Sequence, residues 1–148
     1  VTDTRMQIDL PNDMKANGGV AKLKIEYSFL SPKYGSDRMG IEETKNGKIF
    51  TMAQWYPRMC VYDDILGWNT TPYLGASEFF LEYGNLSANI TVPASHYVVA
   101  SGELLNEKEV YSKEEISRWN QARTSEKTVM IRPESELGKN TKSGTKTW

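Results

Sequence analysis

The feature that most constrains this sequence is a strict alternation of apolar and polar side chains between residues 21 and 29. The apolar side chains fall on every second position: Ala21, Leu23, Ile25, Tyr27 and Phe29. This period of two is typical of a β-strand, because successive side chains of a strand point to opposite faces. The positions between them are lysine, glutamate or serine. The segment therefore predicts a strand with one buried and one solvated face.

Shorter runs of the same kind recur and are separated by turn residues. Lys45-Asn46-Gly47 predicts a tight hairpin between strands 39–44 and 48–53, because Asn-Gly supplies the positive φ angles of such turns. Gly84-Asn85 predicts a second hairpin. Its two strands are 78–83 and 86–92. Further strands are expected at 5–10, 59–62, 97–104 and 128–132.

One segment carries helical signals instead. Ser112 with Glu115 three residues later is a capping box, which predicts the start of a helix that reaches about Arg123 and covers the surface as a flap. At least seven strands without strand–helix alternation predict a mainly all-β fold, an antiparallel β-sandwich or a large curved sheet. We expect a single domain over 1–148 with a helical insertion at 106–127, and a loop-like tail at 138–147.

The charge, length and composition of the chain exclude several classes of function. With 18 basic and 19 acidic residues the net charge is −1, which argues against a nucleic-acid partner. A length of 148 residues is typical of one domain with a core of its own. The apolar runs are far shorter than the roughly 20 residues of a membrane-spanning helix. The single cysteine, Cys60, excludes an internal disulfide.

The inventory of reactive side chains disfavours an enzyme. Cys60 and His96 are the only thiol and imidazole, too few for a zinc site of three or four nitrogen or sulfur ligands. Cys60 in an apolar run is more typical of a small core residue than of a nucleophile. Adjacent Asp63 and Asp64 are more typical of turn chemistry than of an acid–base pair. We therefore assign no catalytic and no metal-binding residue.

Residues 50–64 contain the best candidate for binding. Gln54 is an uncharged amide among apolar side chains, and an unpaired buried amide costs roughly 1–3 kcal/mol. Gln54 therefore either has an internal partner or faces a ligand, with Trp55 and Tyr56 as neighbours. The aromatic residues allow another interpretation, a sugar-stacking platform, although aromatic residues are more often core. Its members would be Trp55, Tyr56, Trp68 and Tyr73.

Over residues 5–105 the chain resembles the N-terminal β-domain of aminopeptidase N-like gluzincin zinc metallopeptidases. The first similar segment runs from Ala53-Gln54 through aromatic residues to Pro57, Cys60 and Asp63-Asp64, although Trp55-Tyr56 replaces the usual Phe-Glu. The others are Ile8 to Ile25 and a set spread along the second half: Gly75, Glu78-Phe79, Tyr83-Gly84, Ile90 to Pro93 and Val98 to Leu104.

The resemblance implies a function that the residues alone do not show. Family members remove residues one at a time from peptide amino termini with a zinc ion held in a following catalytic domain. Gln54 matches the glutamine that helps bind the α-amine of the substrate. The chain would then be an inactive, non-catalytic part of a bacterial, periplasmic or secreted hydrolase. Its partners would be the parent's own catalytic domain and the peptide substrate.

Two points stay open at this stage. Family domains have further strands ahead of the segment that matches residues 5–10, so part of the sheet can be missing and an edge exposed. The alternative from a different functional class is a free-standing β-sandwich module for carbohydrate binding or adhesion. Trp55, Trp68 and Tyr73 would carry that function.

Overall fold

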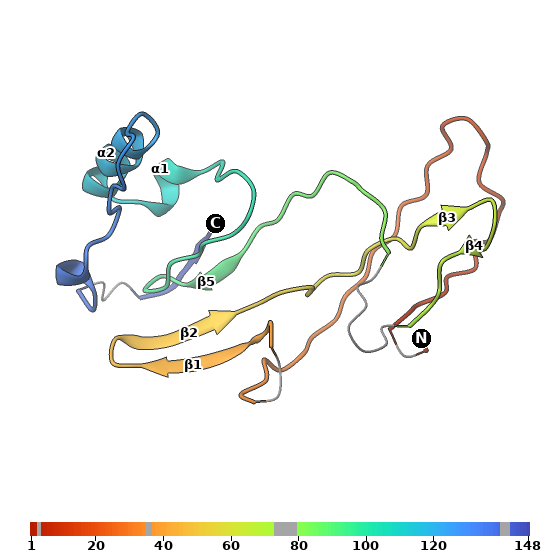
Figure 1. Cartoon of the computed structure of the whole chain (residues 1–148), viewed down its shortest axis with the longest axis horizontal. Coiled ribbons are helices and arrows are strands. Elements are labelled where there is room, and N and C mark those ends of the chain that lie inside the picture. Colours follow the sequence, from red (N-terminus) through yellow and green to blue (C-terminus); the bar gives the residue numbers. More distant parts are fainter. Residues whose placement is uncertain (3, 35–36, 73–79, 140–142) are drawn as a thin grey trace. The chain divides into compact units, whose positions relative to one another are not determined.

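A computed structural model of the chain describes residues 1–2, 4–34, 37–72, 80–139 and 143–148 (Figure 1). The described residues are 13% helix and 18% strand, and the rest is irregular. The chain divides into two compact units, Val1–Gly84 and Asn85–Trp148. Each unit is best understood separately, because they differ in how well they bury their own apolar side chains.

The predicted sandwich or large curved sheet is wrong. The strands of the described residues form three separate two-stranded antiparallel sheets, β1–β2, β3–β4 and β5–β6. Residues 21–29 belong to no sheet, and the strands expected at 5–10, 97–104 and 128–132 are not formed. Alternation specifies which face a side chain occupies, but a strand also needs a neighbour to pair with its backbone. Within the described parts of the chain, no neighbouring strand pairs with these segments.

The hairpin predicted at residues 45–47 is confirmed. Strand β1 (Gly40–Thr44) pairs with β2 (Gly47–Thr51), with Thr44 opposite Gly47. Gly47 has a φ of 116°, whereas Asn46 keeps a negative φ, so glycine alone supplies the left-handed residue. The Thr44 hydroxyl accepts from the Asn46 N–H at 3.1 Å and donates to the Gly47 carbonyl at 2.7 Å. These local bonds fix the turn.

A second short ladder follows in the same unit. Strand β3 (Tyr62–Asp63) pairs with β4 (Gly67–Trp68), and an isolated bridge joins Cys60 to Leu81. The turn between the two strands is held by Asp63, whose Oδ1 accepts from the N–H groups of Ile65 at 2.9 Å and Leu66 at 2.7 Å. This is the turn chemistry that the sequence favoured for the aspartate pair.

The second predicted hairpin, at Gly84-Asn85, is absent from the described residues. Residues 80–83 and 86–92 do not pair with each other, and residues 78–79 of the expected first strand lie outside the described part. Strand β5 (Thr91–Pro93) instead pairs with β6 (Thr145–Thr147), more than fifty positions away, with Val92 opposite Lys146. The tail expected to be a loop therefore ends in a strand.

The helices lie within the range 106–127. They are α1 (Glu107–Val110) and α2 (Lys113–Ala122), and a single 3₁₀ turn, η1, follows at Glu134–Glu136. The capping box at α2 is confirmed: the Ser112 hydroxyl accepts from the Glu115 N–H, and the Glu115 carboxylate accepts from the Ser112 N–H. Helix α2 is more than a surface flap, because Glu115 is buried and Trp119 joins the core of its unit.

The core of residues 85–148 is aromatic. We call Tyr97, Tyr111, Trp119 and Trp148 the aromatic cluster. Tyr111 contacts Trp119 at 5.5 Å and Trp148 at 5.3 Å between ring centroids, and Tyr97 contacts Trp148 at 5.7 Å. All buried hydrophobic residues of the described chain belong to this unit: Ala94, Val110 and Trp148. Trp148, which follows the tail expected to be a loop at 138–147, is central to the core.

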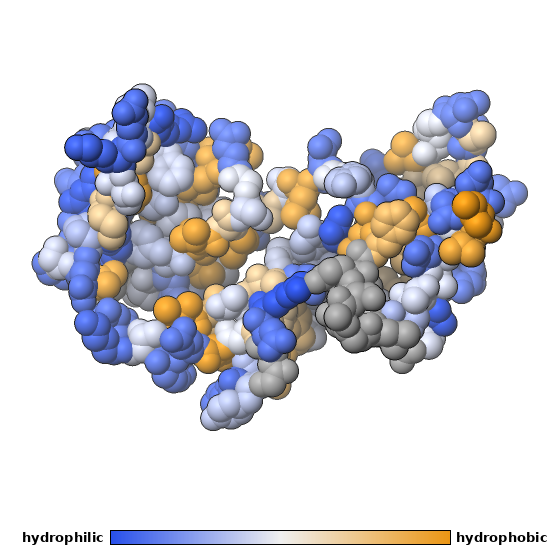
Figure 2. All heavy atoms as spheres, in the orientation of Figure 1, coloured by the Kyte–Doolittle hydropathy of each residue, from blue (hydrophilic) through white to orange (hydrophobic). Residues whose placement is uncertain are grey.

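Residues 1–84 bury far fewer of their large hydrophobic side chains than residues 85–148 do. Among the described residues, only five exposed large hydrophobic side chains belong to the second unit, and all the others lie in residues 1–84. Those five are Leu86, Val99, Leu105, Met130 and Leu137. Figure 2 shows hydrophobic side chains reaching the molecular surface. Monomeric soluble proteins rarely expose apolar surface on this scale unless a partner covers it.

Candidate functional site

The candidate residue Gln54 lies three positions after the end of β2, at a bend in the chain. Its φ is 52°, in the left-handed region that residues other than glycine rarely adopt. Gln54 is exposed, and its side chain forms no hydrogen bond to the described residues. The argument from a buried, unpaired amide therefore does not apply, because water satisfies the side chain. What distinguishes Gln54 is its backbone.

A left-handed residue with a Cβ costs roughly 1–2 kcal/mol, and such residues often cluster at functional sites. The residues that follow Gln54 are held in place. The Tyr27 hydroxyl donates to the Trp55 carbonyl at 2.5 Å, and the Trp55 and Tyr56 rings meet edge to face at 5.2 Å. These contacts anchor the chain directly after the bend, so the amide projects from a fixed point.

The amide has a defined chemical capacity. Its carbonyl oxygen can accept from an ammonium or an N–H group, and its NH₂ group can donate twice. Trp55 is 37% exposed, so an apolar ring surface lies next in sequence to a polar tip. This combination suits recognition of a charged amine with an apolar neighbour. It contains no nucleophile and no base.

Cys60 and His96, the other reactive residues considered in the sequence, make separate local contacts. Cys60 is half-buried and pairs through its backbone with Leu81. Ser95 Oγ lies 3.3 Å from Nδ1 of His96, within the turn after β5. Within the described residues, no group of three or more His, Cys, Asp or Glu side chains is arranged to hold a metal ion.

Two of the residues proposed as a sugar platform pair with each other, and a third pairs with a tyrosine outside that set. Trp55 contacts Tyr56, and Trp68 contacts Tyr62 edge to face at 5.1 Å. No ring contact joins the pairs within the described part of the chain, and Tyr73 lies outside it. Exposed fractions of 37% for Trp55 and 54% for Trp68 leave both rings partly accessible.

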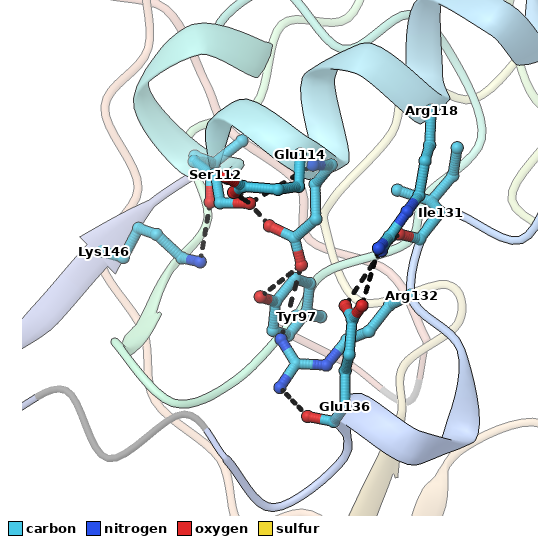
Figure 3. A network of polar contacts seen from close by, with 10 residues as sticks. Tyr97, Ser112, Glu114, Arg118, Ile131, Arg132, Glu136 and Lys146 are labelled. Atoms are coloured by element: carbon cyan, nitrogen blue, oxygen red, sulfur yellow. Dashed lines mark hydrogen bonds and ion pairs between the residues drawn. The ribbon is translucent and has the colours of Figure 1, made fainter.

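A polar network that sequence reasoning missed occupies the core of residues 85–148 (Figure 3). The Glu115 side chain is 6% exposed, and its Oε1 accepts from the Tyr97 hydroxyl at 2.8 Å. Arg132 Nη1 lies 3.5 Å from the same oxygen, and its guanidinium covers the Tyr97 ring at 4.2 Å. Glu115 thus caps the helix with one oxygen and holds two distant segments with the other.

Lys146 closes the network from β6. Its ammonium donates to the Val110 carbonyl at 3.0 Å and lies 4.6 Å from the Tyr97 ring and 4.5 Å from the Trp148 ring. The alternation of threonine with Lys146 and Trp148 in residues 145–148 is a sequence signal for a strand that places these two side chains on the same face. Thr145 and Thr147 point to one face of the strand, and Lys146 and Trp148 to the other.

Burial and the neighbouring Glu115 carboxylate raise the pKa values of Tyr97 and Tyr111. Desolvation, helped by the hydrogen bond to Glu115, raises the pKa of Tyr97 to about 12. Desolvation also raises the pKa of Tyr111. On the outer side of α2, Arg118 forms a two-pronged pair with Glu136 at 2.6 and 2.9 Å. This hydrogen bond holds the pKa of the Glu136 carboxyl below its usual value.

Both oxygens of the Glu115 carboxylate accept hydrogen bonds from the chain, so this network holds the unit together. An open pocket of about 240 Å³ lies elsewhere, in residues 1–84, between 10–14 and 20–21. It is lined mainly by apolar side chains with Asp13 as its charged group.

No helix of the described residues combines the length and apolar character needed to cross a membrane.

Three comparisons with known proteins leave the family of this chain unassigned. No protein-family model matches the sequence, no curated protein matches it, and no solved structure matches the fold.

Proposed function

We propose that this chain is a non-catalytic N-terminal domain of a zinc-dependent, aminopeptidase-like hydrolase. In this proposal residues 1–84 pack on the neighbouring catalytic domain, which carries the zinc ion. Gln54 faces the amino terminus of the peptide substrate. The proposal combines the family resemblance of the segments around Gln54 and Val98 with the surface chemistry of residues 1–84.

The observation that carries the proposal is the exposed apolar face of residues 21–29. Leu23 is 52% exposed, Tyr27 50% and Phe29 45%, and the Tyr27 and Phe29 rings stack with their centroids 6.2 Å apart. Full burial of such a side chain contributes about 1.5–3 kcal/mol, so each has roughly half of that still to gain. A polypeptide that covers this face would stabilise it considerably. A docking domain is expected to have such a surface.

Two features of Gln54 support this role: its exposure and its fixed backbone. An exposed amide with no hydrogen-bond partner among the described residues can accept from the α-ammonium of a peptide, and an ammonium donor strengthens that bond. The bend and the anchored Trp55 reduce the ordering that binding requires. The bond cleavage itself would belong to the neighbouring domain.

The reading frame after Trp148 tests the first half of the proposal. We expect a His-Glu-Xaa-Xaa-His motif within a few hundred codons, a distance typical of domain sizes. A frame that ends shortly after residue 148 without such a motif would refute the assignment.

Kinetics of the full-length protein test the second half. Gln54→Ala should raise KM for aminoacyl substrates by about tenfold, which corresponds to one hydrogen bond to a charged group. The zinc content should stay unchanged. The matched control is Gln121→Ala, because Gln121 is also an exposed amide but lies on α2. Equal kinetics for the Gln54 variant and the wild type would leave Gln54 without a role in binding.

A further inference from the structure

The sequence contains two Asn-Gly steps, Asn17-Gly18 and Asn46-Gly47. At such a step the main-chain nitrogen can attack the side-chain amide of the asparagine, because glycine has no Cβ to shield that nitrogen. Both asparagines and both glycines are exposed, so solvent reaches either step. Exposure therefore does not distinguish the two steps, and a difference in reactivity must come from how each backbone is held.

The Asn46-Gly47 step is held by the hairpin on both sides. Gly47 pairs with Thr44 across the β1–β2 ladder, and its carbonyl accepts from the Thr44 hydroxyl at 2.7 Å. The Asn46 N–H donates to the same hydroxyl at 3.1 Å. The peptide between Asn46 and Gly47 therefore cannot rotate toward the asparagine side chain without breaking these bonds.

The Asn17-Gly18 step lies in the turn of residues 16–18 and is held less firmly. Within the described chain, neither Asn17 nor Gly18 makes a hydrogen bond. Both have a positive φ, 56° for Asn17 and 103° for Gly18, and a Cβ on Gly18 would meet nothing within 4 Å. The peptide between them can therefore rotate and bring the Gly18 nitrogen onto Cγ of Asn17.

We propose that Asn17 is a site of spontaneous covalent modification, in which the Gly18 nitrogen closes a succinimide ring on the Asn17 side chain. The Gly18 N–H gives its proton to hydroxide, the nitrogen bonds to Cγ, and the Cγ–N bond of the amide breaks. Ammonia leaves with a proton from water, which restores the hydroxide. This inference stands independently of the proposed peptidase role.

Water then opens the ring in one of two ways. Attack at Cγ gives aspartate with the main chain unchanged. Attack at the main-chain carbonyl gives isoaspartate, in which the chain continues through the side-chain carbonyl and gains one methylene group. Both products carry one further negative charge, so only the isoaspartate changes the length of the backbone.

The added methylene group falls in a turn that has no room for it. Gly19 lies so close to Lys15 that a Cβ on Gly19 would overlap the Lys15 carbonyl oxygen. A longer main chain at position 17 must therefore displace this contact. The turn joins residues 10–14 to residues 20–21, which are the two walls of the open pocket. The isoaspartate should thus move the pocket walls apart, whereas the aspartate should not.

Peptide mapping by mass spectrometry tests the modification on the 148-residue chain kept at mildly alkaline pH. Loss of Asn17 should be at least about tenfold faster than loss of Asn46, the rate difference expected when a backbone hydrogen bond must break first. Both rates should rise with the hydroxide concentration. In concentrated urea the two rates should become equal, because the hairpin no longer holds Asn46. Equal rates in the native chain, or a difference that persists in urea, would overturn the proposal.

Two variants complete the test. Asn17→Gln should show no loss at position 17 over the same period, because the longer side chain must close a larger ring. Asn17→Asp carries the added charge on an unchanged main chain, and aspartate also tolerates a positive φ. Amide NMR signals of Met14 and Val20 should shift in the isoaspartate fraction of the aged chain and stay in place in Asn17→Asp. The same signals in both would overturn the predicted movement of the pocket walls.

Discussion

The Tyr97 hydroxyl donates to Oε1 of Glu115 at 2.8 Å, and this bond joins the segment after β5 to the first turn of α2. The same carboxylate completes the capping box through its other oxygen. One buried side chain therefore couples the helix start, the tyrosine and Arg132. Removing a partner from such a network leaves a buried group unsatisfied, which costs more than the bond itself contributes.

Substitutions of this pair should be coupled. Tyr97→Phe should lower the free energy of unfolding by about 1 kcal/mol, and Glu115→Ala by about 2–4 kcal/mol, because the alanine also removes the cap and leaves Arg132 without its carboxylate. The double variant should lose less than the sum, as expected for residues in one network. Urea unfolding measures all three. Strict additivity would mean that the contact contributes nothing.

Stability should fall at high pH through Tyr97. Its pKa is raised from 10 in the unfolded chain to about 12, so its contribution is complete below pH 10 and is lost as the pH rises toward 12. Tyr111, whose pKa is also raised, acts in the same direction. Ultraviolet titration of phenolate should show both tyrosines ionising late. In Tyr97→Phe the decline should be shallower; an unchanged decline would assign it to other groups.

Trp148 should be essential to the second unit. It is 7% exposed and contacts Tyr97, Tyr111 and Lys146, so Trp148→Ala should cost about 3–5 kcal/mol. The near-ultraviolet circular dichroism of the aromatic cluster should be lost with it. Trp68→Ala is the control, because Trp68 is 54% exposed. Similar losses for both variants would contradict the assignment of the core.

The backbone of Gln54 predicts opposite effects for two substitutions. Gln54→Gly should raise stability slightly or leave it unchanged, since glycine adopts a φ of 52° without steric cost. Gln54→Val should lower it by about 1–2 kcal/mol, because a β-branched residue is strained in that region. Thermal unfolding of the two variants and the wild type, followed by circular dichroism, provides the comparison. Greater stability of the valine variant would mean that Gln54 does not occupy the left-handed region.

Local signals in the sequence were the most reliable. The hairpin turn at Gly47 and the capping box at Ser112 depend on residues within three or four positions, and both are found. The sandwich failed because alternation in residues 21–29 cannot show whether another strand is available to pair with them. Strand β6 was missed because its partner β5 lies far away and its own residues, Thr145–Thr147, are polar.

The role of Gln54 in binding stays a prediction. Gln54 stood out as an amide among apolar residues, but the argument for burial was wrong, and its left-handed backbone has no signature in the sequence. The network around Glu115 was recognised only as a cap. Contacts of Glu115 with Tyr97 and Arg132 join residues 18 and 17 positions away, and no local pattern indicates them.

Hydrogen exchange of the 148-residue chain tests the central claim most directly, namely that residues 1–84 depend on a partner while residues 85–148 hold themselves together. Amides of α2 and of the β5–β6 ladder should exchange slowly, and amides of residues 21–29 should exchange at nearly the rate of an unfolded chain. Protection of residues 21–29 equal to that of α2 would show that the first unit completes its own sheet. The account of a docking surface would then be wrong.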